Sequence, residues 1–207
     1  MIGIVDYGIG NVSAFLKCFE LIDKPACRIT SPDELHIASG LILPGVGSFD
    51  VVMETLESRG FIDPLHERVV GAATPVLGVC VGMQIMALAS EEGVLPGLGW
   101  WETTVKSLKL ESESATVMLP HMGWNEVVAS NENGLFSGLQ SSEFYFLHSF
   151  GFLELDRELV MALSTYGSQF ISAAGQGNVF GVQFHPEKSH DDGLRLLGNF
   201  AEIAQNA

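Results

Sequence analysis

The first half of the chain alternates short apolar runs with segments in which apolar residues recur at helical spacing. Short apolar runs are typical of buried strands, and apolar residues three and four positions apart are typical of amphipathic helices. The predicted strands lie at 2–5, 26–30, 41–43 and 76–79, and the predicted helices at 12–22, 49–56, 62–70 and 83–89. Ser31-Pro32-Asp33-Glu34 has the signature of a further helix start. This alternation predicts a parallel sheet with helices on both faces.

The pattern changes after residue 93. Short segments of alternating polarity, separated by Gly and Asn, are typical of antiparallel strands. We predict such strands at 103–105, 115–119, 126–128, 144–150, 159–163, 170–174 and 179–184, with a polar loop at 111–114 and a closing helix at 193–203. The prediction is therefore one domain, 1–207: an α/β fold of the flavodoxin-like type. Its open, mostly parallel sheet would carry added antiparallel strands in the C-terminal half.

Composition narrows the function classes. The chain is 47% hydrophobic and 17% charged, which describes a well-buried globular protein, and its net charge of −15 argues against nucleic acid or an anionic membrane as a partner. Three scattered cysteines form no disulfide framework and favour a reducing, cytoplasmic setting. There is no basic leader and no apolar run approaching the roughly 18 residues of a membrane span. Gly8-Ile9-Gly10 lacks the third glycine of a phosphate loop, so we expect no nucleotide there. We also expect no metal and no other cofactor.

The segment Gly78-Val79-Cys80-Val81-Gly82 carries the first chemical signal. It lies between a buried strand and a helical pattern, which is the arrangement of a nucleophile elbow with cysteine in place of serine. Glycines two residues before and after Cys80 leave room for a sharp turn, and the N-terminus of a helix favours a thiolate. Taken alone, the segment could equally hold a buried structural cysteine.

The second signal is the end of the last predicted strand. Alternate residues of a strand face the same side, so we expect His185 and Glu187 to point together, with Pro186 marking the strand end. The carboxyl ends of parallel strands gather the chemistry of such sheets, and Cys80 lies at another such end. A surface histidine is the alternative for His185 alone. Together, Cys80, His185 and Glu187 have the nucleophile, base and orienting carboxylate of a catalytic triad.

These motifs carry a family resemblance. The elbow with Gln84, together with His185-Pro186-Glu187, resembles the class I glutamine amidotransferases. Further segments resemble the glutaminase subunits of imidazole glycerol phosphate synthases, and they cover essentially the whole chain: 6–11, 44–47, 120–125, 145–149 and 181–189.

The resemblance implies that Cys80 attacks the side-chain amide of L-glutamine, forms a thioester and releases ammonia. It implies a heterodimer in which the partner, a (β/α)₈-barrel cyclase subunit of histidine biosynthesis, uses the ammonia to form imidazole glycerol phosphate and an aminoimidazole carboxamide ribotide. The implied oxyanion hole involves Val81, Gly45 and Val46. The implied glutamine-binding residues are Gly47, Gln84, Glu92 and Ser149. The implied partner interface includes Asn11, Trp124, Tyr145, His148 and Lys188.

Other functions stay open. The stretch 100–105 departs from the histidine-pathway pattern and is similar to paralogous amidotransferases that supply ammonia for surface-polysaccharide sugars. A stand-alone cysteine hydrolase would share the elbow cysteine. A non-catalytic scaffold would require the loss of a triad member, and all three are present. For Trp124 and Tyr145 the alternative is ordinary packing.

Overall fold

The structure is a computed structural model that describes residues 1–109, 117–130, 134–139 and 141–207. Within these ranges, strands form a nine-stranded sheet in the order β2-β1-β3-β4-β12-β11-β10-β7-β8 and a three-stranded sheet in the order β5-β6-β9. The predicted loop at 111–114 and the start of the predicted strand at 115–119 lie outside the described residues. The described remainder, 117–119, is not a strand, so that prediction is wrong there.

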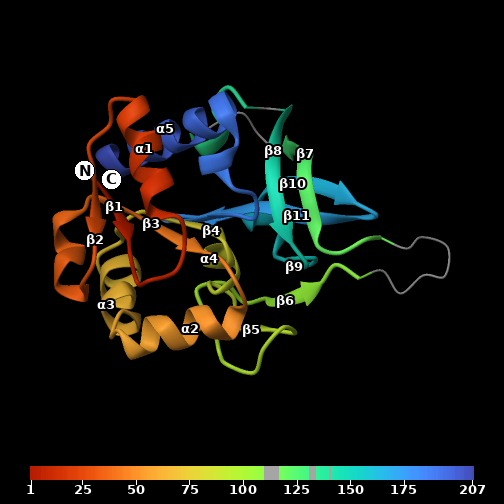
Figure 1. Ribbon diagram of the computed structural model, residues 1–207, viewed down its shortest axis with the longest axis horizontal. Coiled ribbons are helices and arrows are strands. Elements are labelled where there is room, and N and C mark those ends of the chain that lie inside the picture. The colour runs from red at the N-terminus through yellow and green to blue at the C-terminus, as the bar shows by residue number, and fades with distance from the viewer. Residues whose placement is uncertain (110–116, 131–133, 140) are drawn as a thin grey trace.

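One half of the large sheet is parallel, as predicted. Its strands are β1 (Ile2–Val5), β2 (Ala26–Ile29), β3 (Gly40–Gly45), β4 (Val76–Cys80) and β12 (Val179–Val182). Every residue of β1, β3 and β4 is buried, because helices cover both faces. Figure 1 shows α1 (Val12–Leu21) and α5 (His190–Asn206) above the sheet, and α2 (Phe49–Ser58) and α3 (Ile62–His66) below it. The predicted fold class is confirmed.

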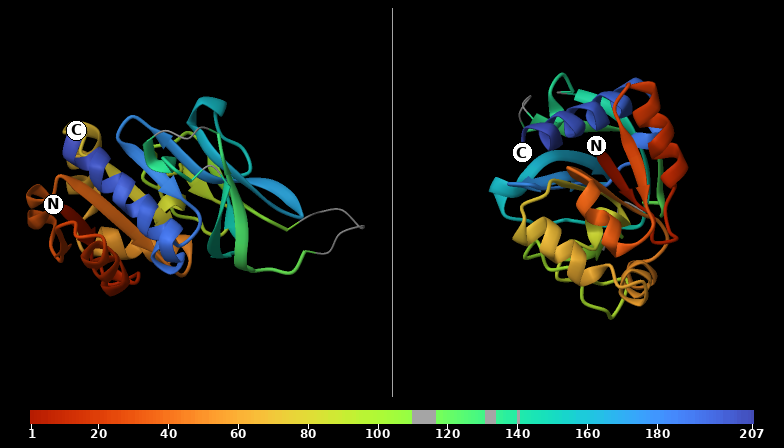
Figure 2. Two further views of the ribbon diagram at one scale, coloured as in Figure 1. Left: turned by 90° about the horizontal axis from the view of Figure 1, so that it is seen from above. Right: turned by 90° about the vertical axis from the view of Figure 1, so that its left-hand side faces the viewer.

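The other half of the large sheet is antiparallel and extends to one side of the helical layers (Figure 2). It consists of β7 (His121–Ala129), β8 (Ser141–His148), β10 (Val160–Tyr166) and β11 (Ser168–Gln176). The small sheet contains β5 (Ala89–Ser90), β6 (Thr104–Ser107) and β9 (Phe150–Gly151). The predicted strand at 144–150 is therefore two strands, because the chain turns after His148 and Phe150 pairs with β6.

The predicted helix at 83–89 is wrong in its length. Helix α4 covers only Val81–Gln84, and the residues after it are turns. Backbone N–H groups of residues 97–101 donate hydrogen bonds to the carbonyls of the residues after α4. Leu98 donates to the Ile85 carbonyl at 2.7 Å, and Trp100 donates to the Met86 carbonyl at 2.8 Å. With those carbonyls bonded elsewhere, the helix cannot continue.

Two other predicted helices differ in type. The helix after Ser31 is a 3₁₀ helix, η1 (Pro32–Ile37), whose start is held by the Glu34 carboxylate accepting from the backbone N–H of Thr30 and Ser31. The helix predicted at 62–70 is α3 followed by a π-helical turn, η2 (Glu67–Gly71). The remaining short 3₁₀ turns are η3 (Gly134–Phe136), η4 (Arg157–Leu159) and η5 (Pro186–Lys188).

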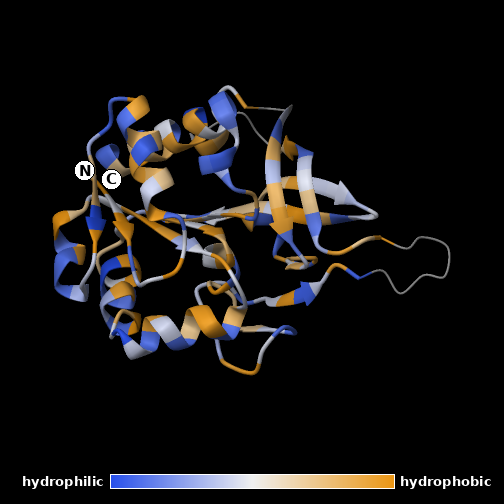
Figure 3. Cartoon of the chain, viewed as in Figure 1, coloured by the Kyte–Doolittle hydropathy of each residue, from blue (hydrophilic) through white to orange (hydrophobic). Residues whose placement is uncertain are grey.

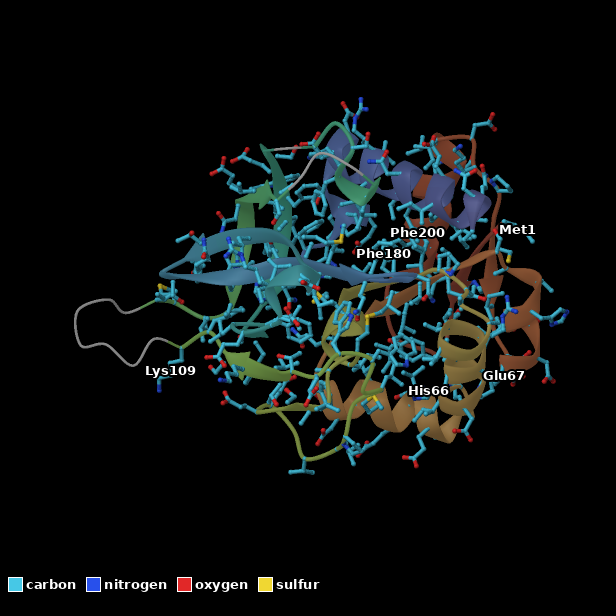
Figure 4. The ribbon with its side chains drawn as sticks, turned by 180° about the vertical axis from the view of Figure 1, so that it is seen from behind. Met1, His66, Glu67, Lys109, Phe180 and Phe200 are labelled. Carbon is cyan, nitrogen blue, oxygen red and sulfur yellow. The ribbon has the colours of Figure 1, made fainter. Side chains whose placement is uncertain are left out.

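The core lies between the sheet and its helices. Figure 3 shows hydrophobic residues concentrated on the central strands. Phe180 of β12 faces Phe200 of α5, with ring centroids 6.4 Å apart (Figure 4). Among the described residues, none of the helices has the length and apolar character that crossing a membrane requires.

The elbow packs backbone against backbone. A Cβ at Gly82 would lie 1.9 Å from the Leu43 carbonyl oxygen, and one at Gly78 would lie 2.4 Å from the Gly82 carbonyl oxygen. Both positions therefore require glycine, because the overlapping atoms belong to the backbone of β3 and of the turn, which cannot move aside as a flexible side chain can. Helix α4 is thereby held directly against the end of β3.

We predict that Gly82→Ala lowers the free energy of unfolding by about 2 kcal/mol or more, since the added methyl group would overpack rigid backbone. Gly71→Ala is the matched control, because no atom lies within 4 Å of a Cβ there. Urea unfolding followed by circular dichroism measures both. Equal stability of the two variants would contradict the packing argument.

Candidate active site

Cys80 lies in the turn between β4 and α4, at the floor of a cavity of about 280 Å³. Its backbone has φ +56° and ψ −114°, a conformation that costs roughly 1–3 kcal/mol in a residue other than glycine. Only 3% of the residue is exposed. Parallel pairing places Gly45, the last residue of β3, beside Cys80. The strained turn is that of the predicted nucleophile elbow.

His185 and Glu187 meet, although not for the predicted reason. They do not alternate along a strand: β12 ends at Val182, and Glu187 lies in the 3₁₀ turn η5. That turn brings the Glu187 carboxylate to 2.9 Å from His185 Nδ1, with both side chains buried. The Tyr145 carbonyl accepts from the His185 backbone N–H at 2.8 Å and fixes the position of the turn.

The electrostatics favour a protonated His185. Burial alone would lower its pKa, but hydrogen bonds and charges from Cys80 and Glu187 outweigh that cost and raise the pKa of His185 to about 9. The second carboxylate oxygen of Glu187 is buried and has no hydrogen-bond partner among the described residues. A buried carboxylate in this position stabilises the imidazolium, so the ring holds a proton at neutral pH.

The predicted oxyanion-hole residues border Cys80. Val81 lines the cavity as the first residue of α4. A Cβ on Gly45 would lie 2.2 Å from the Gly82 nitrogen, so only glycine fits there. Val46 is 43% exposed, and Gly47 has φ +91° with no atom within 4 Å of a Cβ position. The loop is therefore tightly held at Gly45 and loosely packed beyond it.

Tyr7 also anchors the Gly45 end of this loop, through Pro44. Its hydroxyl donates to the Pro44 carbonyl, and its side chain is fully buried. Burial and the nearby charge of Cys80 both raise the pKa of Tyr7 above its ordinary value, so the hydroxyl stays a donor. No role for Tyr7 was predicted from the sequence, although it belongs to the family-like segment 6–11.

The predicted glutamine-binding residues line the same cavity: Gly47, Gln84, Glu92 and Ser149. One Glu92 carboxylate oxygen accepts from the Phe49 backbone N–H at 2.8 Å, at the start of α2. This bond holds the carboxylate at the cavity wall. Gln84 lines the cavity and also bonds within the protein. Its amide nitrogen donates to the Phe150 carbonyl at 2.8 Å and to the Gln183 side-chain oxygen at 2.9 Å.

The predicted interface residues fall into three environments. Asn11 is exposed, but its side chain caps α1 by accepting from the Ala14 N–H. Trp124 is 46% exposed, and the Lys188 ammonium lies 5.5 Å from the centre of the Tyr145 ring, which meets Trp124 edge to face. These three residues form one aromatic and basic cluster, and Lys188 also lines the cavity. His148 lies inside the protein, where it is 6% exposed.

His148 forms a buried neutral pair with His121. The His121 Nδ1 lies 2.9 Å from His148 Nε2, and His148 Nδ1 donates to the Phe150 carbonyl at 2.8 Å. Burial lowers the pKa of His148 to about 3 and that of His121 to about 4. The pair therefore places no positive charge beside the imidazolium of His185.

The unusual stretch at 100–105 serves packing. The Trp100 indole N–H donates to His66 at 3.1 Å. Trp101 is 2% exposed and packs edge to face on Phe152, with ring centroids 5.9 Å apart. Trp101 is thus buried and Trp100 partly buried against the hydrophobic core.

Comparison with solved structures defines the class of fold. A crystal structure described as a glutamine amidotransferase superimposes with a TM-score of 0.75 at 21% identity, covering 99% of this chain and 98% of that chain. A structure of PurLQS from Thermotoga maritima gives 0.72 at 18% identity, covering 98% and 97%. At these identities the likeness establishes the shared fold alone.

Sequence comparison then defines the family. The family model "Glutamine amidotransferase class-I" matches residues 11–203. The chain is 47% identical to the imidazole glycerol phosphate synthase subunit HisH of Bdellovibrio bacteriovorus and 43% identical to that of Leptospira interrogans, covering 98% of this chain and 100% of each relative. The chain belongs to the class I glutamine amidotransferase family.

We predict that the His185 ring titrates with a midpoint near pH 9, as its raised pKa of about 9 requires. Glu187→Gln should move the midpoint down, toward the ordinary value near 6.5, because the variant loses the carboxylate that stabilises the imidazolium. Nitrogen-15 NMR of the histidine rings measures this. The control Glu57→Gln alters an exposed glutamate of α2 and should leave the midpoint in place. An unmoved midpoint in Glu187→Gln would contradict the assigned pairing.

Proposed function

We propose that the chain is the glutaminase subunit of an imidazole glycerol phosphate synthase. It hydrolyses L-glutamine to glutamate and delivers the ammonia to a (β/α)₈-barrel cyclase subunit in a heterodimer of histidine biosynthesis. The observation that carries the proposal is the elbow cysteine at the floor of a cavity beside a buried imidazolium–carboxylate pair. The near full-length relatives named as HisH subunits support the pathway.

In the first half-reaction, His185 already holds the proton, so the Cys80 sulfur attacks as a thiolate. A bond forms between the sulfur and the side-chain amide carbon of glutamine, and the carbonyl electron pair moves to oxygen. Backbone N–H groups of Val81 and of the Gly45–Val46 loop stabilise this oxyanion. His185 then protonates the amide nitrogen and the carbon–nitrogen bond breaks. Ammonia departs, and a γ-glutamyl thioester remains on Cys80.

In the second half-reaction, neutral His185 takes a proton from water, whose oxygen attacks the thioester carbon. The carbon–sulfur bond breaks and restores the thiolate–imidazolium pair, and glutamate leaves after its new carboxyl group loses a proton to solvent. Glu187 accepts a hydrogen bond from His185 Nδ1 and keeps the ring oriented throughout. Glu92 offers a negative charge to the ammonium group of glutamine, while Gly47 and Ser149 supply the rest of the binding wall.

The exposed cluster of Trp124, Tyr145 and Lys188 is the proposed docking surface for the barrel subunit. Tryptophan and tyrosine are typical of interface anchors, and Lys188 lies over the Tyr145 ring and also lines the cavity. The three cysteines, all within the described part of the chain, are free thiols. This supports a reducing, cytoplasmic setting.

We predict that Cys80→Ala abolishes glutamine-dependent synthesis by the complex while ammonia-dependent synthesis continues. Cys80 only generates ammonia, and it does not touch the acceptor. Steady-state assays of the two-subunit complex with each nitrogen source, and with the cyclase substrate as acceptor, measure this. Loss of both activities would contradict the division of labour. A wild-type complex that never aminates the cyclase substrate would instead favour a polysaccharide sugar as acceptor.

We predict that the isolated chain is a poor glutaminase and that the barrel subunit raises its rate by about a hundredfold or more, the cost of one missing oxyanion donor. The loosely packed loop at Val46 and Gly47 can hold a peptide with its N–H or its carbonyl toward the oxyanion. The partner shifts this equilibrium only if it binds the active orientation more tightly. Glutamate release with and without the barrel subunit measures the effect. Full activity of the chain alone would favour a stand-alone hydrolase.

A further inference from the structure

Two glutamine side chains form a buried relay that ends at the reacting sulfur. Gln84 lies in α4 and is 2% exposed, and Gln183 follows β12 and is 1% exposed. Gln84 Nε2 lies 2.9 Å from Gln183 Oε1, and Gln183 Nε2 lies 3.6 Å from Cys80 Sγ. The Gln183 backbone N–H donates to the Ser172 carbonyl at 2.9 Å, which fixes the base of its side chain.

The direction of both amides follows from their partners. A carbonyl oxygen only accepts, so the Gln84 atom 2.8 Å from the Phe150 carbonyl is its NH₂ group. The same nitrogen lies within hydrogen-bond distance of Gln183, whose facing atom must therefore be its oxygen. The other end of the Gln183 amide, which faces Cys80, is consequently the NH₂ group. Rotating either amide by half a turn would bring two donors or two acceptors together.

We propose that Gln183 is a further catalytic residue that donates a hydrogen bond to the Cys80 sulfur, and that Gln84 is the positioning residue that fixes its amide. This inference rests on the proposed glutaminase function. An N–H donor favours a thiolate over a thiol and stabilises the sulfur again when the thioester breaks. The Leu147 carbonyl, 3.8 Å from the sulfur, can accept only from the thiol form, so the Gln183 donor opposes that bond and supports the thiolate.

The relay also limits how Gln84 meets a substrate. Both N–H bonds of its amide are directed at protein acceptors, the Phe150 carbonyl and Gln183. Only its oxygen is left for a ligand in the cavity. Gln84 therefore contacts glutamine as an acceptor from an N–H group, and its loss should affect the sulfur even when no glutamine is bound.

The test is alkylation of Cys80 by iodoacetamide in the full-length chain without glutamine, quantified at the Cys80 peptide by mass spectrometry. Gln183→Met keeps the approximate volume and removes the donor. It should slow alkylation at neutral pH about tenfold, the scale of one hydrogen bond to a charged group. The difference should shrink in strongly alkaline solution, where the thiol is ionised without help. A purely steric effect of the substitution would persist there.

Further variants test the relay. Gln84→Met should slow alkylation about threefold by freeing the Gln183 amide, and it should add nothing in a Gln183→Met background, as expected for residues that act in series. The control Gln176→Met, on an exposed glutamine of β11, should alkylate at the wild-type rate. Should Gln183→Met fail to fold, Gln183→Glu still accepts from Gln84 but offers no N–H to sulfur, and it should also slow the reaction.

A wild-type alkylation rate in folded Gln183→Met or Gln183→Glu would overturn the proposal. So would an additive effect of the two methionine substitutions. Glutaminase activity of the wild-type complex is measured in parallel. Its absence would overturn the proposed function, whereas a slowed Cys80 reaction in Gln183→Met would still establish the donor.

Discussion

The active site depends on one close contact between backbones. Helix α4 reaches the end of β3 because Gly82 and Gly45 present no side chains to one another, and a Cβ at either would overlap backbone atoms. This contact holds Cys80 in its strained conformation and places the loop after Gly45 in the lining of the same cavity. The carboxyl ends of β3, β4 and β12 then supply the loop, the nucleophile and the imidazolium from three adjacent strands.

Charge is arranged sparingly around that framework. The protein carries a net charge of −15, yet His185 is paired with one buried carboxylate, and the buried histidines His121 and His148 are neutral. Because His121 and His148 are too deeply buried to protonate at neutral pH, the proton in this region resides on His185.

The features that could be predicted from the sequence are those that short motifs and the spacing of apolar residues determine. The parallel strands, the elbow glycines and the association of Cys80 with the His185–Glu187 pair all follow from short motifs and strand order. The length of α4 did not, because carbonyls after Gln84 are bonded by residues 97–101, a pairing that no local pattern indicates. The approach of Glu187 to His185 depends on a 3₁₀ turn instead of strand alternation. Gln183 was visible in the motif, but its role requires knowing which atom of each amide faces which partner.

Two groups of residues near the Cys80 sulfur differ in how tightly they are held, and this difference bears on how the activity can be regulated. On one side, Gln84 and Gln183 are buried and hydrogen-bonded to each other, with Gln84 also bonded to the Phe150 carbonyl, so the environment of Cys80 is fixed before a substrate arrives. On the other side, Val46 and Gly47 are loosely packed between the anchored Gly45 and the start of α2. In the proposed function, a partner subunit thus regulates the oxyanion loop without disturbing Cys80. Regulation placed on the sulfur itself would instead have to break buried hydrogen bonds, each costly to leave unmade.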